Sequence, residues 1–97
     1  MDTIEIHIRF RGLIADLAGV SETRETVPKG TMLEDLVRRL ADRLKPGFGQ
    51  LVLDKKRKIH PGVMIVAADR VIPPARLSDW RLKDGVVVEI CTLVAGG

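Results

Sequence analysis

An apolar run at residues 86–93 has hydrophobic side chains at both odd and even positions. Because successive side chains of a strand point to opposite faces of a sheet, such a run predicts a strand in the centre of a sheet. A second strand is predicted at residues 3–11, where alternate side chains are apolar: Ile4, Ile6, Ile8 and Phe10. We expect the two strands to lie side by side and parallel, since this pairing buries the aliphatic side chains of both.

One amphipathic helix is predicted in the middle of the chain. Its apolar side chains recur at spacings of three and four residues: Leu33, Leu36, Val37, Leu40, Ala41 and Leu44. This spacing places them in one stripe that can pack on a sheet. Thr31 and Glu34 have the spacing of a capping box, which predicts the start of the helix, and Pro46-Gly47 predicts its end.

Weaker patterns predict a helical turn at 13–19, a polar edge strand at 22–27, an apolar strand at 63–67 covered on both faces or nearly so, and a brief strand at 71–72. Residues 48–61 have the loosest pattern, with a short strand or turn at 50–54. One main helix packed on a mixed four- to five-stranded sheet makes a two-layer α+β fold. Residues 1–97 are predicted to form a single domain.

Composition favours a folded domain over a disordered chain. The chain has 97 residues, of which 45% are hydrophobic and 30% charged. No run approaches the roughly 18 apolar residues of a membrane span. The first residues show no signal peptide. We therefore expect a cytoplasmic protein with no membrane partner.

Residue types used in catalysis and metal binding are scarce. Cys91 is the only cysteine, and neither it nor His7 and His60 has metal-ligand spacing to a partner, so no metal site is predicted. The same three residues do not form a recognisable set of nucleophile, base and orienting group. Cys91 lies in the last strand and is interpreted as a small buried hydrophobic side chain. An enzyme with its own active site is therefore disfavoured.

The net charge is +3, and its sharpest local concentration is Lys55-Lys56-Arg57-Lys58. A basic run can lie against phosphate or against an acidic protein surface. The chain has two phenylalanines, one tryptophan and no tyrosine, too few for a platform that stacks bases. We expect no nucleic-acid partner. The basic run is interpreted as a solvated loop, with contact to an acidic protein as the second reading.

The chain ends in Leu93-Val94-Ala95-Gly96-Gly97, directly after the last predicted strand, and residues 94–97 are expected to be flexible. Glycine has no Cβ, so a terminal pair can enter a channel too narrow for a branched residue. A carboxylate must be activated, typically as a mixed anhydride with a nucleotide, before a sulfur or nitrogen nucleophile can take the acyl group. Taken alone, this tail is equally compatible with a frayed end that has no chemical role.

The sequence resembles the small sulfur-carrier proteins of the MoaD/ThiS family in three segments. They are the strand and short helix at residues 8–19, Leu82-Lys83-Asp84-Gly85 before a valine-rich strand, and the Gly96-Gly97 end. The resemblance implies a ubiquitin-like β-grasp fold over nearly the whole chain. It also implies that Gly97 is the covalent carrier. Its carboxylate would be adenylylated by a ubiquitin-activating-like adenylyltransferase, which uses ATP, and then converted to a thiocarboxylate.

Further roles are implied by the resemblance alone. Gly96 would be the permissive neighbour of the reactive glycine, and Leu93, Val94 and Ala95 would thread the channel of the partner. Family members also present an apolar sheet face to the activating enzyme, to which Cys91 would contribute here. The chain would bind no cofactor itself and would be a protein cosubstrate, not an enzyme.

The destination of the sulfur stays open at this point. The chain length and the short helix are similar to the molybdopterin type, in which the chain would be the small subunit of a synthase complex and a sulfur-accepting synthase subunit its partner. Cys91-Thr92 before the tail is closer to the thiamine type, and residues 55–58 look like an insertion in either. Molybdopterin is the first choice, thiamine thiazole the second, and another sulfur transfer or protein conjugation the third. The alternative is a ubiquitin-like interaction or conjugation module that donates no sulfur.

Overall fold

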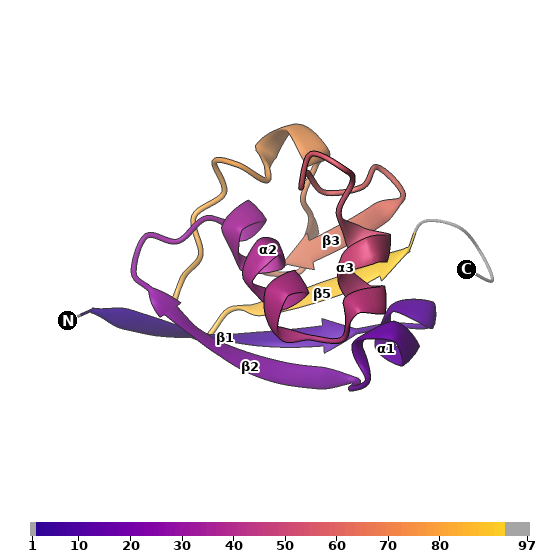
Figure 1. Ribbon diagram of the computed structural model, residues 1–97. Helices are drawn as coiled ribbons and strands as arrows, with labels where there is room; N and C mark the ends of the chain where they lie inside the picture. Colours follow the sequence, from indigo (N-terminus) through magenta and orange to yellow (C-terminus); the bar gives the residue numbers. More distant parts are fainter. Residues whose placement is uncertain (1, 93–97) are drawn as a thin grey trace.

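The computed structural model describes residues 2–92, in which five strands form one mixed sheet with helices on one of its faces (Figure 1). Along the chain the elements are β1 (Thr3–Phe10), α1 (Leu13–Ala18), β2 (Glu22–Pro28), α2 (Leu33–Arg43), α3 (Pro46–Val52), β3 (Val63–Ala67), β4 (Arg70–Val71), the 3-10 turn η1 (Pro74–Arg76) and β5 (Val87–Thr92). The strand order is β2-β1-β5-β3-β4. The predicted α+β fold is therefore confirmed, with five strands.

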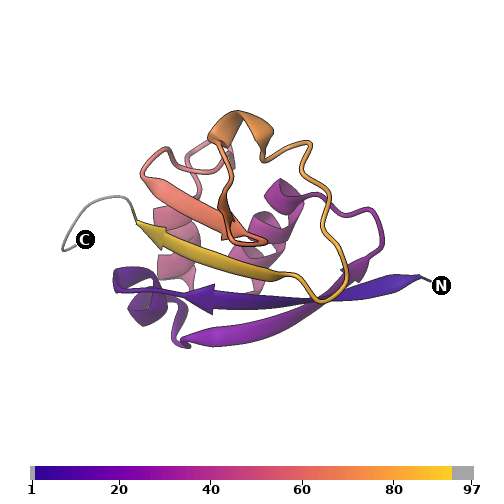
Figure 2. The same ribbon diagram turned by 180° about the vertical axis from the view of Figure 1, so that it is seen from behind.

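The first and last strands are neighbours in the centre of the sheet. β1 and β5 run parallel, with His7 opposite Val87 and Phe10 opposite Ile90. On its other edge β5 pairs antiparallel with β3, so it lies between two strands (Figure 2). This arrangement confirms the predicted parallel central pair.

One hydrophobic core lies between the sheet and the helices. The stripe of α2 is fully buried at Leu33, Leu36, Val37 and Leu40. Burying each such side chain is worth about 1.5–3 kcal/mol. Between the sheet and α3, the rings of Phe10 and Phe48 meet edge to face with centroids 5.3 Å apart. The position of α2 on the sheet is thus set by its apolar stripe, as its spacing predicted.

The start of α2 differs from the prediction, because no capping box forms. The hydroxyl of Thr31 donates instead to the carbonyl of Pro28, at 2.7 Å. The amides of Leu33 and Glu34, in the first turn of the helix, donate to backbone carbonyls in the segment 77–80, at 2.9 and 3.0 Å. A segment distant in sequence therefore satisfies the helix end, which local spacing could not reveal.

A second helix occupies the part of the chain with the loosest pattern. Pro46 follows the end of α2 and also begins α3, since proline is well tolerated in the first turn of a helix. The predicted short strand or turn at 50–54 is therefore wrong for most of its length. Gly49 lets α3 approach α2, because a Cβ at this position would lie 3.3 Å from the Cβ of Ala41.

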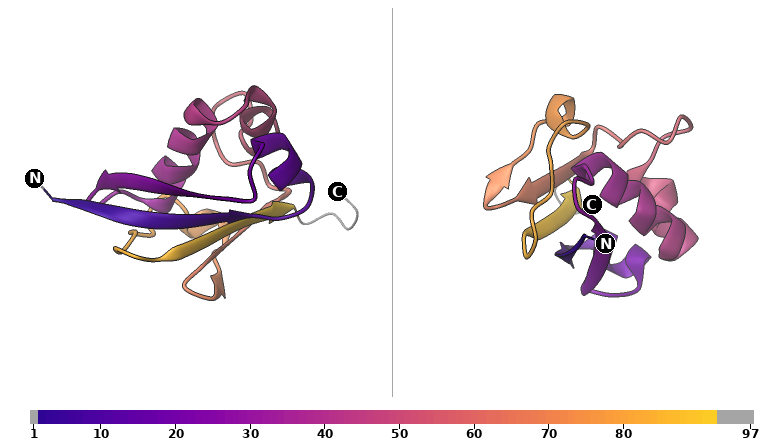
Figure 3. Two further views of the ribbon diagram at one scale, coloured as in Figure 1. Left: turned by 90° about the horizontal axis from the view of Figure 1, so that it is seen from below. Right: turned by 90° about the vertical axis from the view of Figure 1, so that its left-hand side faces the viewer.

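The helices cover one face of the sheet, and the other face is open (Figure 3). In β3, Val63, Ile65 and Ala67 are buried on the helical side, whereas Met64 and Val66 are half-buried on the open side. The strand predicted at residues 63–67 is therefore present, but it is fully covered on one face only. Within residues 2–92, no helix is long and apolar enough to cross a membrane.

Candidate functional site at the end of β5

The predicted reactive tail begins where β5 ends. Thr92 is the last described residue, so Leu93, Val94, Ala95, Gly96 and Gly97 lie outside the described residues. What the structure describes is the strand that leads to them. β5 is held by β1 on one edge and by β3 on the other, so Thr92 lies at the end of a central strand.

The ladder between β3 and β5 ends at the pair Val63 and Thr92. In the residues that lead into β3, each backbone N–H group is already hydrogen-bonded within the turn or is absent. The amide of Val63 donates to the carbonyl of His60, and the amide of Gly62 donates to Nδ1 of His60, both at 3.0 Å. Pro61 has no N–H group. Residues 61–63 thus offer no backbone donor to the chain beyond Thr92.

β1 turns away from β5 at the same end of the sheet. The amide of Arg11 donates to the carbonyl of Ile90, at 3.2 Å. Gly12 then takes a positive φ of 58°, which glycine adopts without a Cβ clash, and α1 follows. β1 therefore leaves the sheet beside Ile90, whereas β3 begins opposite Thr92, the last described residue of β5.

The open face carries an apolar patch on the β3, β4 and β5 side. We define the apolar patch by the side chains on this face: Met64, Val66, Val71, Val87 and Cys91. Val71 is 60% exposed and Val87 is 36% exposed. Apolar side chains grouped on an exposed face are typical of a surface that binds another protein.

One ion pair reaches into this patch, because Glu89 lies between Val87 and Cys91 on the same face of β5 and opposite Val66. Nη2 of Arg11, just beyond β1, lies 3.0 Å from Oε1 of Glu89 in β5. The arginine side chain is 62% exposed, so the pair adds only about 0–1 kcal/mol to stability. Its larger effect is to place one positive and one negative group beside the apolar side chains, next to the polar residues Glu5, His7 and Arg9 that β1 presents on the same face.

Cys91 lies half-buried on the open face, not fully buried as its interpretation as a core residue expected. Its thiol donates to the carbonyl of Met64, at 3.7 Å. Burial raises the pKa of the Cys91 thiol, the charge of Glu89 raises it further, and the charge of Arg11 partly opposes both. The thiol is thereby kept protonated, which disfavours a role as nucleophile.

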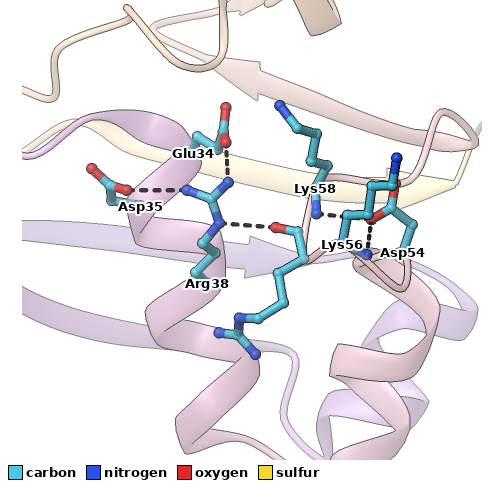
Figure 4. Close-up of polar contacts among 7 residues, drawn as sticks. Glu34, Asp35, Arg38, Asp54, Lys56 and Lys58 are labelled. Atoms are coloured by element: carbon cyan, nitrogen blue, oxygen red, sulfur yellow. Dashed lines mark hydrogen bonds and ion pairs between the residues drawn. The ribbon is translucent and has the colours of Figure 1, made fainter.

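The other candidate residues are dispersed. His7 lies on the open face in β1, and His60 lies in the turn before β3 with Nδ1 occupied by the amide of Gly62. Within residues 2–92, no group of three or more histidine, cysteine, aspartate or glutamate side chains is placed to hold a metal ion. The basic run forms a loop between α3 and β3, on the helical side (Figure 4).

The resemblance placed Cys91 and part of the last strand in a partner surface, but sequence reasoning missed the members of the patch in β3 and β4: Met64, Val66 and Val71. It took continuous apolar runs as a sign of burial on both faces. The available signal was the shortage of helices, because one long amphipathic helix cannot cover both faces of a sheet. A sheet covered on one face leaves every second residue of an apolar strand exposed.

The sequence profile of the ThiS family matches residues 8–97. Among solved structures, the chain is similar to a Pyrococcus furiosus protein assigned as molybdopterin converting factor subunit 1, with TM-score 0.73, 25% identity, and 94% of this chain and 99% of that chain covered. It is similar to Urm1 from Trypanosoma brucei, with TM-score 0.76, 25% identity, and coverage of 100% and 99%.

SAMP1 from Haloferax volcanii has TM-score 0.83 at 15% identity, with 96% of this chain and 99% of that chain covered, and this likeness concerns the fold alone. No curated protein matches the chain in sequence. The profile match spans nearly the whole chain and includes both terminal glycines. As the resemblance to the MoaD/ThiS proteins predicted, the chain belongs to the ThiS family, whose members are ubiquitin-like sulfur-carrier and modifier proteins with the β-grasp fold.

Proposed function

We propose that the chain is a sulfur carrier whose reactive group is the carboxylate of Gly97. The observation that carries the proposal is the continuity of the family match, which begins in β1 and runs through β5 to Gly97. A central strand paired on both edges gives the tail a rigid root. Two terminal residues without side chains suit entry into a narrow channel of a partner enzyme.

The proposed chemistry has two stages. An activating enzyme of the ubiquitin-activating type uses ATP to form the acyl adenylate of Gly97, and pyrophosphate leaves. If the sulfur nucleophile is hydrosulfide, it attacks the acyl carbon, AMP leaves, and the thiocarboxylate forms directly. If it is a persulfide of a donor protein, AMP leaves and an acyl disulfide forms; a second thiol then attacks the donor sulfur, which releases the thiocarboxylate and leaves a disulfide on the donor side. The catalytic groups belong to the partners, since in residues 2–92 neither histidine is hydrogen-bonded to the thiol of Cys91.

The apolar patch is the proposed contact surface for the activating enzyme. It continues along β5 to the point where the tail begins, so one partner can cover the patch and receive the tail together. The protonated thiol of Cys91 acts there as an apolar side chain. This role keeps Cys91 in the partner surface but gives it no covalent chemistry.

Molybdopterin formation is the proposed destination of the sulfur, with thiamine thiazole formation second. The similarity to the Pyrococcus furiosus protein supports the first, at 25% identity over 94% of this chain. In this role the chain is the small subunit of a synthase complex, and a larger subunit accepts the sulfur. The family match by itself supports both destinations.

Protein conjugation is the second candidate function. It is favoured by the similarity of the fold to SAMP1, a small archaeal modifier protein in Haloferax volcanii and Methanosarcina acetivorans. The two functions share the acyl adenylate and differ in the acceptor. A sulfur acceptor gives a thiocarboxylate, whereas a lysine amine gives an isopeptide bond to another protein.

Intact mass spectrometry tests the sulfur-carrier proposal. After incubation with the cognate activating enzyme, ATP and a sulfur donor, the protein should gain the mass difference between one oxygen and one sulfur. Deletion of Gly97 should abolish this gain without changing the folded core, because the residue follows the last described strand. An unchanged mass, with an enzyme shown to be active on another carrier, would refute the proposal. Covalent adducts with other proteins would favour conjugation.

A further inference from the structure

The basic run forms a preorganised loop, not a loose one (Figure 4). Oδ1 of Asp54 accepts hydrogen bonds from the backbone amides of Lys56 and Lys58, at 2.8 and 3.0 Å. The amide of Asp54 in turn donates to the carbonyl of Lys58, at 2.8 Å. The hydrogen bond from Lys58 is the main reason why the pKa of Asp54 lies below its usual value. The carboxylate therefore stays charged and holds the turn.

The loop is also fastened to α2. Nε of Arg38 donates to the carbonyl of Arg57, at 2.9 Å, while the same guanidinium pairs with Glu34 and Asp35 (Figure 4). The guanidinium of Arg57 binds both carboxylate oxygens of Asp42, at 3.0 and 3.2 Å. Arg57 has a positive φ of 61°, a conformation that costs a residue with a side chain about 1–3 kcal/mol. These bonds offset that cost.

Of the four basic side chains in this run, one makes an ion pair within the fold and three do not. Arg57 turns back to α2, whereas Lys55, Lys56 and Lys58 are exposed. None of these three ammonium groups pairs with an acidic group within residues 2–92. The charges of Lys56 and Lys58 help to lower the pKa of Asp54 only as its smallest causes, and neighbouring like charges repel each other, so the fold gains little from the three ammonium groups. We call these three lysines the basic loop.

The basic loop lies close in sequence to the end of the sheet from which the tail departs. It is followed by the turn at 60–62 and then by Val63, which pairs with Thr92. Lys58 is five residues before Val63, so their Cα atoms are at most about 18 Å apart. A protein that takes up the tail therefore comes within reach of the lysine side chains.

We propose that Lys55, Lys56 and Lys58 dock an acidic surface of the protein that takes up the C-terminal tail. The inference rests on the proposed function, because it needs a partner that binds the tail. A rigid loop loses little conformational entropy when it is bound. An acidic protein fits better than nucleic acid, since Phe10 and Phe48 are buried and the loop contains no aromatic side chain to stack on bases.

The molecule supplies a matched control at its opposite end (Figure 1). Lys29, Arg81 and Lys83 are also exposed and surround a pocket of about 690 Å³ beside the start of β1. Asp2 and Asp84 line the same pocket, so its charge is mixed. A charge reversal of these three residues changes the net charge by the same amount as reversal of the basic loop.

The test compares K55E/K56E/K58E with K29E/R81E/K83E and the wild type in adenylylation by the cognate activating enzyme. We expect the basic-loop variant to raise KM about tenfold with little change in kcat, and to lose most of the salt dependence of kcat/KM. The control variant should stay near the wild type. Thermal unfolding and NMR spectra establish that both variants are folded.

An unchanged KM in the basic-loop variant, or an equal rise in both variants, overturns the inference. Failure of the proposed function looks different, because the wild type itself is then not adenylylated. In that case a decaglutamate peptide is the probe, and NMR should show shifts at the amides of residues 55–58 that vanish at high salt. Absence of these shifts, or shifts caused by a DNA duplex and not by the peptide, also overturns the inference.

Discussion

Neighbours on the sheet set the reactivity of Cys91. Burial and the carboxylate of Glu89 raise the pKa of the thiol, while Arg11 lowers it. Only the thiolate attacks iodoacetamide, so the pH midpoint of alkylation should be higher in the folded protein than in urea. Glu89→Gln should lower this midpoint, and Arg11→Ala should raise it. The measured quantity is the pH at which the alkylation rate is half of its maximum. A change in the accessibility of the thiol alters the maximal rate, whereas a change in its pKa moves this midpoint.

The same shift has a consequence for stability. The folded state holds the thiol proton to higher pH than the unfolded state does, because the pKa of Cys91 is raised on folding. Its contribution is complete below the unfolded pKa and is lost as the pH rises through the folded pKa. Equal alkylation midpoints in Glu89→Gln and Arg11→Ala would contradict this account of the thiol.

Single residues were predictable where a local rule decided their position. The alternation at Ile4, Ile6, Ile8 and Phe10 gave the correct buried face of β1. Gly19, placed to end a helical turn, has the expected positive φ of 83° after α1. Thr31 and Glu34 followed an equally good local rule and failed, because carbonyls from residues 77–80 occupy the helix end. Such a contact across the chain leaves no trace in local spacing.

At the scale of elements, the close approach of α2 and α3 depends on Gly49. A Cβ there would lie 3.3 Å from the Cβ of Ala41 and 3.4 Å from its carbonyl oxygen. Gly49→Leu should therefore lower the free energy of unfolding in urea by about 1–3 kcal/mol, because a larger side chain forces the helices apart. Gln50→Leu adds the same side chain at the next, exposed position and should change stability by less than about 0.5 kcal/mol. Similar losses in both variants would show that the contact with Ala41 is not the cause.

A helix or strand was predictable when its apolar periodicity and the signals at its two ends indicated the same element. The stripe of α2, the polar edge strand β2 and the apolar strand β3 all had one dominant pattern, and each is present. α3 was missed because Pro46 and Gly47 were taken as the end of one helix and not as the first turn of the next. A proline signals a boundary, but it does not say on which side the helix lies.

At the scale of the whole molecule, a substitution on the open face should affect partner binding without affecting the stability of the core. Val87 is 36% exposed in the apolar patch, so Val87→Lys should change stability by less than about 0.5 kcal/mol. The lysine would place a charge inside the proposed enzyme contact, and KM for adenylylation should rise at least about tenfold. Val20→Lys is the control, since Val20 is 42% exposed between α1 and β2, outside the patch. A normal KM for Val87→Lys would exclude the patch as the contact surface.

The arrangement of the sheet was predictable only in part. The apolar character of the first and last strands indicated that they are central and parallel, and this is confirmed. The apolar run at 63–67 suggested cover on both faces of that strand, whereas the structure leaves Met64 and Val66 half-buried on the open face. Local sequence shows how apolar a strand is, but it does not show whether an apolar side chain is buried in the core or exposed in a patch that binds another protein.

The position of β5 also dictates when the molecule can fold. β5 is the last strand described, yet it separates β1 from β3 and brings Val88 and Ile90 into the core. The β1–β2 pairing is local and can form early, but β1 and β3 are joined in one sheet only when β5 enters between them, since contacts this distant in sequence form late. The open surface that spans β3 and β5 therefore exists only after this last step of folding, so a partner that binds it would select folded molecules.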